Sequence, residues 1–197
     1  MKFALRDDDL NYFYNPLVIT ENYKDIWDIC PVSMSVVPFI KGNWNKNVKD
    51  AEKRGPGILN KKILEKLISD NKVYPIGENI ELVDFIKEKI GSKKIYLTIH
   101  AIHHRNEDPI VPNLLQNFGF GAEFLTSRDL TEELGKAIIY LENIFGQSIK
   151  VFTPPQNLYS KKGLKAVTNN NLALCSDLWG LKKIETLDLI GLKNYTN

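Results

Sequence analysis

Cysteine, long apolar runs and an excess of either charge are all scarce in this sequence. Two of its 197 residues are cysteines, Cys30 and Cys175, and both lie among apolar residues. We therefore expect the buried, reduced thiols of a cytoplasmic protein instead of a disulfide framework. No apolar run approaches the roughly 20 residues that span a bilayer, and the early acidic residues of MKFALRDDDL argue against a signal peptide.

The balance of charge argues against a further class of partner. Lysine and arginine number 26 against 24 aspartates and glutamates, which gives a net charge of +2. Domains that bind nucleic acid or an anionic membrane usually carry a clear basic excess, so we expect neither partner. The chain length and a hydrophobic content of 43% suit a single globular domain over residues 1–197.

Short apolar segments alternate with longer segments of helical period along the chain. The pattern predicts strands over 2–6, 31–38, 94–99, 149–153 and 172–176. It predicts helices after Asn60, over 82–90 with an end at Gly91, and from Asp129 as N-cap to Gly146. Strands that alternate with amphipathic helices are typical of parallel sheets in α/β folds, whether the sheet is open or closed.

The first strand is followed by three carboxylates, and functional residues of parallel α/β folds gather at the carboxyl ends of strands. Asp7, Asp8 and Asp9 follow Arg6 after the strand 2–6. Adjacent carboxylates repel one another unless a cation or a basic group neutralises them. A solvated acidic turn explains this run equally well, so the run alone does not predict a site.

All three histidines of the chain lie at the end of the strand 94–99. His100, His103 and His104 fall within five positions, and imidazole is the commonest metal ligand. Two histidines four positions apart reach one cation when the chain curls after a strand. Together with a carboxylate from the first strand end, they form a two-histidine, one-carboxylate set that suits Zn²⁺ or another first-row divalent ion. A second carboxylate beside the first would serve as general base.

Three further segments add candidate residues. Pro154 and Pro155 stiffen the chain in 152–157 (FTPPQN), where another strand ends. Glu123 in GFGAEF adds a carboxylate near a possible strand end, and the long polar loop 41–60 contains Trp44. Each has an alternative: the segment 152–157 is a loop without function, Glu123 is a surface residue, and the indole of Trp44 merely anchors its loop.

The order of these motifs resembles the polysaccharide deacetylase (NodB-like) superfamily. Asp-Asp, His-x-x-x-His and a later Phe-x-Pro-Pro-x-Asn are similar to the motifs of one branch, over about residues 2–180. The resemblance implies a distorted (β/α) barrel of the glycoside hydrolase and deacetylase type. It also implies that Asp8 is the general base, and that Asp9, His100 and His104 bind one divalent metal ion, for which Zn²⁺ is the first candidate.

Two motifs depart from the family pattern. In the better-known deacetylases the third motif begins with an arginine that pairs with the base, whereas Thr153 stands at that position; Arg6 and Arg105 are candidates to replace it. The family's last motif, whose histidine is the general acid, is absent, since no histidine follows His104. Either the chain lacks the last barrel strand, or another group serves, or the enzyme is impaired. His103 is the candidate acid, with a packing role as its alternative.

The resemblance implies hydrolysis of an acetyl group from an N- or O-acetylated carbohydrate by a metal-activated water. The candidates for binding this substrate are Arg6, Trp44, Glu123, Pro155 and Asn157. Two alternatives stay open. One is a non-catalytic carbohydrate-binding protein of the same fold, and the other is a metal hydrolase that acts on another amide or ester.

Overall fold

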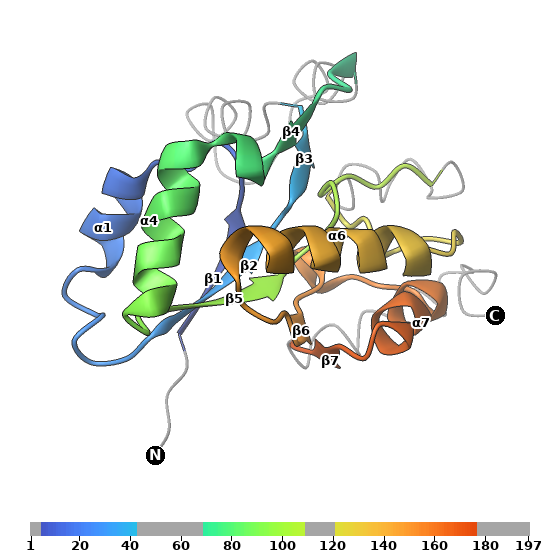
Figure 1. Ribbon diagram of the computed structural model, residues 1–197. Helices are drawn as coiled ribbons and strands as arrows, with labels where there is room; N and C mark the ends of the chain where they lie inside the picture. The colour runs from blue at the N-terminus through green and yellow to red at the C-terminus, as the bar shows by residue number, and fades with distance from the viewer. Residues whose placement is uncertain (1–4, 43–68, 109–120, 177–197) are drawn as a thin grey trace, which may run out of the picture.

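A computed structural model describes residues 5–42, 69–108 and 121–176. Their main feature is a sheet with the strand order β1-β2-β5-β6-β7, in which every neighbouring pair is parallel (Figure 1). The strands are β1 (Leu5–Leu10), β2 (Val32–Val36), β5 (Ile95–Ile99), β6 (Val151–Phe152) and β7 (Ala173–Leu174). Because all pairs are parallel, the carboxyl ends of the strands share one edge of the sheet.

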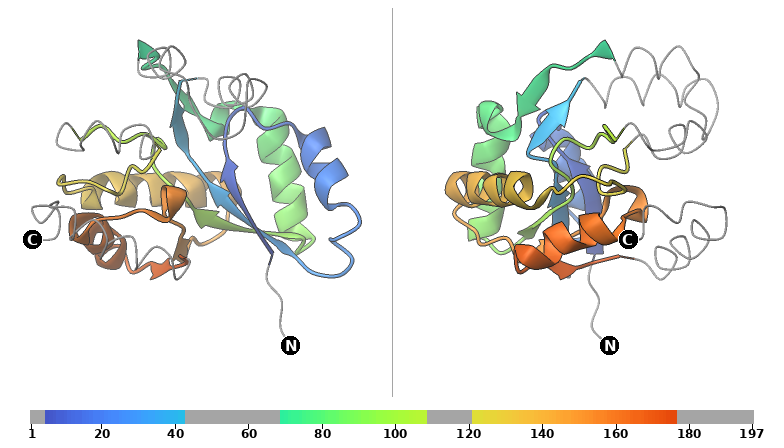
Figure 2. Two further views of the ribbon diagram at one scale, coloured as in Figure 1. Left: turned by 180° about the vertical axis from the view of Figure 1, so that it is seen from behind. Right: turned by 90° about the vertical axis from the view of Figure 1, so that its right-hand side faces the viewer.

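Four helices lie in the described connections: α1 (Pro16–Tyr23), α4 (Ile80–Gly91), α6 (Thr131–Phe145) and α7 (Lys161–Asn169). The side chains of Asn15, Asn79 and Ser160 cap α1, α4 and α7 by accepting a backbone N–H. Helix α6 ends at Gly146, which takes the left-handed conformation with φ of 65°. Helix α4 contacts α1, α6 and β5, and α7 contacts α6 and β7 (Figure 2).

A separate antiparallel pair follows the second strand of the sheet. Strand β3 (Phe39–Lys41) pairs with β4 (Val73–Pro75), and the short 3₁₀ helix η1 (Ile76–Glu78) comes next. In Figure 1 this pair extends beyond the carboxyl edge of the parallel sheet. It therefore lies at the same end of the molecule as the strand exits that carry the candidate site.

The two faces of the central strands differ in chemistry. One face is apolar and buried, and β2 and β5 contribute to it Val32, Met34, Val36, Ile95, Leu97 and Ile99. On the other face Thr98 Oγ1 donates to Ser35 Oγ at 2.9 Å, and Ser35 Oγ donates to Thr153 Oγ1 at 3.2 Å. Because strand side chains alternate with a period of two, His100 lies on the same face as the hydroxyl of Thr98.

Most of the predicted elements are confirmed. Strands lie within the predicted ranges 31–38, 94–99, 149–153 and 172–176, and two predicted helices end at Gly91 and before Gly146. The N-cap of α6 is Leu130 and not Asp129, although Asp129 Oδ1 still accepts from the Thr131 N–H at 2.9 Å. The helix predicted after Asn60 lies outside the described residues.

The prediction for the first strand is wrong about where the strand ends. Strand β1 runs to Leu10, so the three aspartates lie within it and do not form a solvated turn after it. Aspartate is depleted in strands, but pairing with β2 along this edge overrides that preference. Helices α1 and α7 and the β3–β4 pair are further elements that the periodicity did not reveal.

The α/β class with parallel strands is confirmed, whereas the sheet is not closed within the described residues. Strands β1 and β7 form its two edges. The edges nevertheless approach each other, since Arg6 Nη1 on β1 donates to the Cys175 carbonyl, directly after β7, at 3.4 Å. Among the described residues, no helix is long and apolar enough to cross a membrane.

The expectation that both thiols are buried is wrong. Cys30 is partly exposed and Cys175 is exposed, and both are free thiols. Cys175 follows β7, whose two residues are themselves exposed, because β7 is an edge strand with a neighbour on one side. The apolar neighbours of a cysteine in the sequence therefore did not predict its burial here.

Candidate metal centre

Asp9 owes its position to a bulge in β1. Between its pairs at Asp7 and Leu10, β1 contains one residue more than β2. Asp9 itself takes φ of 72°, in the left-handed region, and the Asn11 side chain donates to its carbonyl at 2.6 Å. A bulge redirects side chains that strict alternation would send to opposite faces. The bulge therefore decides which of the adjacent carboxylates faces the end of β5.

His100 is the first residue after β5 and is buried. Its Nδ1 lies 3.0 Å from the Thr153 carbonyl oxygen. Because a carbonyl oxygen accepts only, Nδ1 carries the hydrogen and Nε2 of the neutral ring carries the lone pair. That Nε2 lies 3.1 Å from Asp9 Oδ1. An imidazole lone pair that faces a carboxylate oxygen is unfavourable unless a proton or another cation lies with them.

His104, which follows His100 by four residues in the same loop, completes the cluster. It is buried and takes φ of 54°, and its Nε2 lies 2.9 Å from the same Asp9 Oδ1. One ligand atom from each of Asp9, His100 and His104 lies within 4.8 Å of the other two. Two imidazole nitrogens and one carboxylate oxygen at this spacing fit a divalent ion such as Zn²⁺. The structure thus brings together the three residues that the sequence singled out as ligands.

The electrostatics of the cluster favour a cation. Burial alone would raise the pKa of Asp9, but the charge of His104 and the close approach of both imidazoles hold it well below its usual range. Burial would likewise lower the pKa of His104, but the Asp9 carboxylate, with Glu123 further away, raises it. A proton on His104 therefore compensates Asp9 when no metal ion is bound, and a divalent ion would take over that role.

The three adjacent carboxylates have separate partners, which offset part of the repulsion expected from their proximity. Asp8 Oδ1 lies 3.0 Å from Arg6 Nε in an ion pair that is about one-third exposed. Asp7 shares a hydrogen bond with Tyr23 of α1, and burial raises the pKa of Asp7 despite that bond. Only Asp9 of the three joins the histidine cluster.

Of the two arginines considered as partners for Asp8, Arg6 makes the contact. Its Nη1 also donates to the Cys175 carbonyl, so that one guanidinium links β1 to the end of β7. The Arg105 guanidinium donates to Asn71 Oδ1 at 2.8 Å and to the Asp70 carbonyl at 2.6 Å. Arg105 therefore holds the segment before β4.

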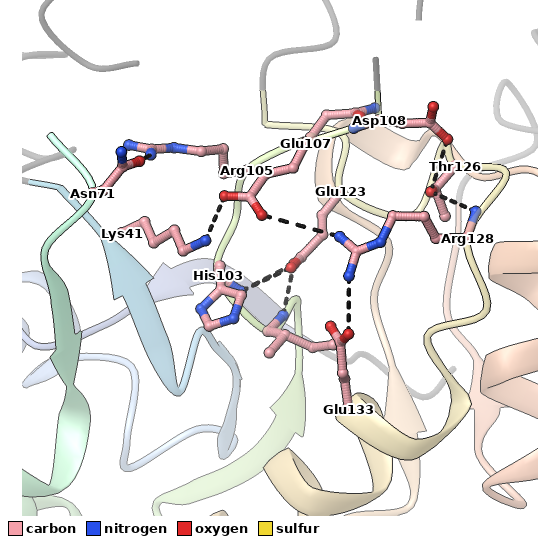
Figure 3. A network of polar contacts seen from close by, with 12 residues as sticks. Lys41, Asn71, His103, Arg105, Glu107, Asp108, Glu123, Thr126, Arg128 and Glu133 are labelled. Atoms are coloured by element: carbon pink, nitrogen blue, oxygen red, sulfur yellow. Dashed lines mark hydrogen bonds and ion pairs between the residues drawn. The ribbon is translucent and has the colours of Figure 1, made fainter. Parts of the chain in front are cut away.

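His103 lies outside the metal cluster. Its Nδ1 donates to the Phe39 carbonyl at 2.8 Å, and its ring packs against the Phe39 ring with centroids 6.2 Å apart. Figure 3 shows this imidazole close to Lys41 and Glu107. These contacts with β3 favour the packing alternative for His103 over a role as general acid.

The remaining candidates for substrate binding differ in their surroundings. Glu123 is buried, which rules out the surface alternative, and its carboxylate accepts backbone N–H groups of the loop 102–104. Pro155 is buried in the 3₁₀ helix η2 (Pro155–Asn157), where Asn157 Oδ1 accepts from Ser176 Oγ at 3.5 Å. Trp44 lies outside the described residues.

Two contributors to the site were missed in the sequence. The Thr153 carbonyl orients His100, and a backbone acceptor leaves no signal in the residue type. A Cβ atom at Gly121 would lie 2.6 Å from His104 Cε1, so this position needs glycine for the close approach of the imidazole. The glycine-rich GFGAEF is the one signal that pointed to this segment.

Comparisons of the sequence with protein-family models and with curated proteins find no match. Among solved structures, a CE4 family pseudoenzyme from Bacillus anthracis is similar, with 12% identity and a TM-score of 0.45 over 88% of this chain and 43% of that one. A mutant of that protein with restored enzymatic activity gives 12% identity and a TM-score of 0.44 over 87% and 43%. The chain spans less than half of either structure, and a likeness this slight supports no inference about activity.

Proposed function

We propose that this protein is a metal-dependent hydrolase that removes an acetyl group from an N- or O-acetylated carbohydrate. The observation that carries the proposal is the convergence of Asp9, His100 and His104 on one point. These are the positions at which the resemblance of the sequence implies the metal ligands. A hydrolase needs a base close to its metal, and Asp8 is the adjacent residue.

The metal would be held by Asp9 Oδ1 and by Nε2 of His100 and His104. When bound, a divalent ion of this kind supplies Lewis acidity that polarises a carbonyl and makes a water more acidic. The chain's own contribution is orientation. The Thr153 carbonyl fixes the tautomer of His100, so that its Nε2 lone pair faces Asp9.

Asp8 is the proposed general base, which takes a proton from the attacking water. The Arg6 guanidinium, 3.0 Å from Asp8 Oδ1, holds this carboxylate in one orientation. Arg6 would thus do what an arginine of the third motif does in the better-known deacetylases, where this chain has Thr153. The same guanidinium donates to the Cys175 carbonyl at 3.4 Å, and this second contact supports a fixed orientation of Arg6.

The sugar would lie against the strand exits at this edge. Pro155 and Asn157 are the candidates from the exit of β6, and Trp44 is the candidate for stacking on a sugar ring. Glu123 is better explained as a support for the histidine loop, because backbone amides occupy its carboxylate.

A binding-only protein of the same fold is the second candidate, and the position of His103 favours it. The histidine expected to protonate the leaving group donates to the Phe39 carbonyl and packs on β3. A site that holds a metal and a sugar but lacks an acid would bind without turnover.

The test is an acetate-release screen of the Zn²⁺-loaded protein on N-acetylated and O-acetylated oligosaccharides, with a generic phosphodiester beside them. Release of acetate by the wild type, lost in Asp8→Asn and kept in Asp84→Asn, would support the deacetylase. Asp84 is exposed on α4 and serves as the matched control. Bound metal with binding but no hydrolysis of acetylated sugars would favour the second candidate. Phosphodiester cleavage with inert acetyl sugars would refute both.

A further inference from the structure

Three consecutive backbone amides converge on the buried carboxylate of Glu123. Oε2 accepts from the N–H groups of Ile102, His103 and His104 at 2.8, 3.0 and 3.2 Å. Oε1 accepts from His103 N as well, at 3.1 Å. Figure 3 shows the Glu123 side chain directed at the backbone of His103. Glu123 is 7% exposed, so the carboxylate and its amide partners are largely shielded from solvent.

These amides belong to the loop that carries the proposed metal ligands. The chain leaves β5 at Ile99 and must turn so that His104 faces the same point as His100. His104 takes φ of 54°, which residues other than glycine seldom adopt and which persists where the surroundings enforce it. A carboxylate that accepts several amides supplies strong bonds at this point.

The contact is reciprocal between the two segments. Asn106, just after the histidine loop, donates through Nδ2 to the carbonyls of Ala122 and Leu125 at 2.9 and 2.8 Å. Gly121 lies against the imidazole of His104, closely enough that a Cβ atom would lie 2.8 Å from Nδ1. The segment 121–125 therefore contacts both the backbone and the ring of the same histidine.

We propose that Glu123 is a positioning residue, which holds the backbone of 102–104 so that His104 is aimed at the site formed with Asp9 and His100. The proposal rests on the proposed metal site for its purpose. The hydrogen bonds from the three amides to Glu123, which we call the clamp, are present in the chain without metal. Glu123 touches neither the substrate nor the reacting atoms in this role.

The closing experiment compares Co²⁺ binding in the wild type, Glu123→Gln and Glu133→Gln. Glutamine keeps the size of the side chain but turns an N–H donor toward amides that are themselves donors. We expect Co²⁺ affinity about 10- to 100-fold weaker in Glu123→Gln, the usual cost of losing such a support, with a changed visible spectrum of the bound ion. Glu133 is exposed and pairs with Arg128, so Glu133→Gln should match the wild type. Equal affinity and spectrum in all three proteins would overturn the proposal.

Amide hydrogen exchange in the metal-free protein gives a readout that does not depend on activity. The amides of Ile102, His103 and His104 should exchange slowly in the wild type and faster in Glu123→Gln. Should Glu123→Gln fail to fold, fast exchange of these amides in the wild type would overturn the clamp, and slow exchange would support it. A wild type that binds no Co²⁺ would refute the proposed metal site, and the exchange data would still decide the clamp.

Discussion

Asp8 and Asp9 are adjacent and chemically identical, yet the fold gives them different surroundings. Asp9 faces two buried imidazoles, whose Nε2 atoms lie 3.1 and 2.9 Å from one of its oxygens. Asp8 faces a guanidinium in a partly exposed ion pair. The bulge between Asp7 and Leu10 creates this difference, because without it alternation alone would set the two directions. The comparison teaches that the partner, and not the residue type, separates the proposed ligand from the proposed base.

The largest expected effect separates the two carboxylates directly. Asp9→Asn should lose most of the bound Zn²⁺ and all turnover, because an amide is a poor substitute for an anionic ligand. Asp8→Asn should keep one Zn²⁺ per chain and still lose turnover, because an amide cannot accept the proton. Elemental analysis and acetate release on the same samples make the comparison. Loss of metal in Asp8→Asn would erase the distinction between the two residues.

Arg6 tests the Asp8 side of the comparison. Arg6→Gln should lower kcat about 10- to 100-fold, the scale on which a misplaced catalytic group costs rate, and should leave Zn²⁺ content unchanged. Arg6→Lys keeps the charge and should recover part of the rate, whereas Arg128→Gln at an exposed pair should have no effect. Steady-state kinetics with metal analysis is the measurement. A rise in KM with unchanged kcat would assign Arg6 to substrate binding instead.

The pH dependence tests the Asp9 side. Because the pKa of His104 is raised in the folded protein, its pair with Asp9 stabilises the metal-free fold below about pH 6.5 and is lost as pH rises through the raised value. Because the pKa of Asp9 is depressed, its contribution is present above about pH 3.9 and is lost as pH falls toward the depressed value.

Zn²⁺ affinity should follow the opposite trend near neutral pH, because the ion must displace the His104 proton. It should fall by up to about tenfold per pH unit once the pH drops below the raised pKa of His104. Thermal unfolding of the metal-free protein and Zn²⁺ titration across pH are the measurements. Asp8→Asn should retain the pH dependence of the metal-free stability and that of the Zn²⁺ affinity, whereas Asp9→Asn should lose the pH dependence of the stability. Identical profiles in the two variants would contradict the assignment.

The smallest expected effect is that of His103→Ala. If the imidazole packs on Phe39, as its contacts indicate, the variant should keep kcat within a few-fold and lose some thermal stability. A general acid would instead cost on the order of 10²-fold or more in rate. The pH profile of kcat distinguishes the two outcomes, because removal of an acid also removes the alkaline limb of the profile.

Much of the fold and the set of candidate ligands could be predicted because both leave a pattern in residue type. Alternation identified the central strands, and helical period with Gly146 identified α6. His100 and His104 were recognisable because histidines are rare here and their spacing follows a buried strand. Those signals depend on local sequence, which periodicity captures well.

The parts that could not be predicted depend on backbone geometry and on long-range contacts. The prediction for the end of β1 was wrong because pairing with β2 keeps Asp7 to Asp9 in the strand, against the residue preference of aspartate. The bulge at Asp9 and the left-handed turn at His104 leave no periodic signal. The ion pair of Arg6 with Asp8 was one of two options in the sequence, and side-chain geometry decided between them.

The central claim is that Asp9, His100 and His104 bind one divalent ion. The most direct test is Zn²⁺ titration with elemental analysis of the wild type, His100→Ala, His104→Ala and His103→Ala, all at pH 8. The account predicts one ion per chain in the wild type and in His103→Ala, and loss of most of it in the other two. Unchanged stoichiometry and affinity in both His100→Ala and His104→Ala would contradict the account.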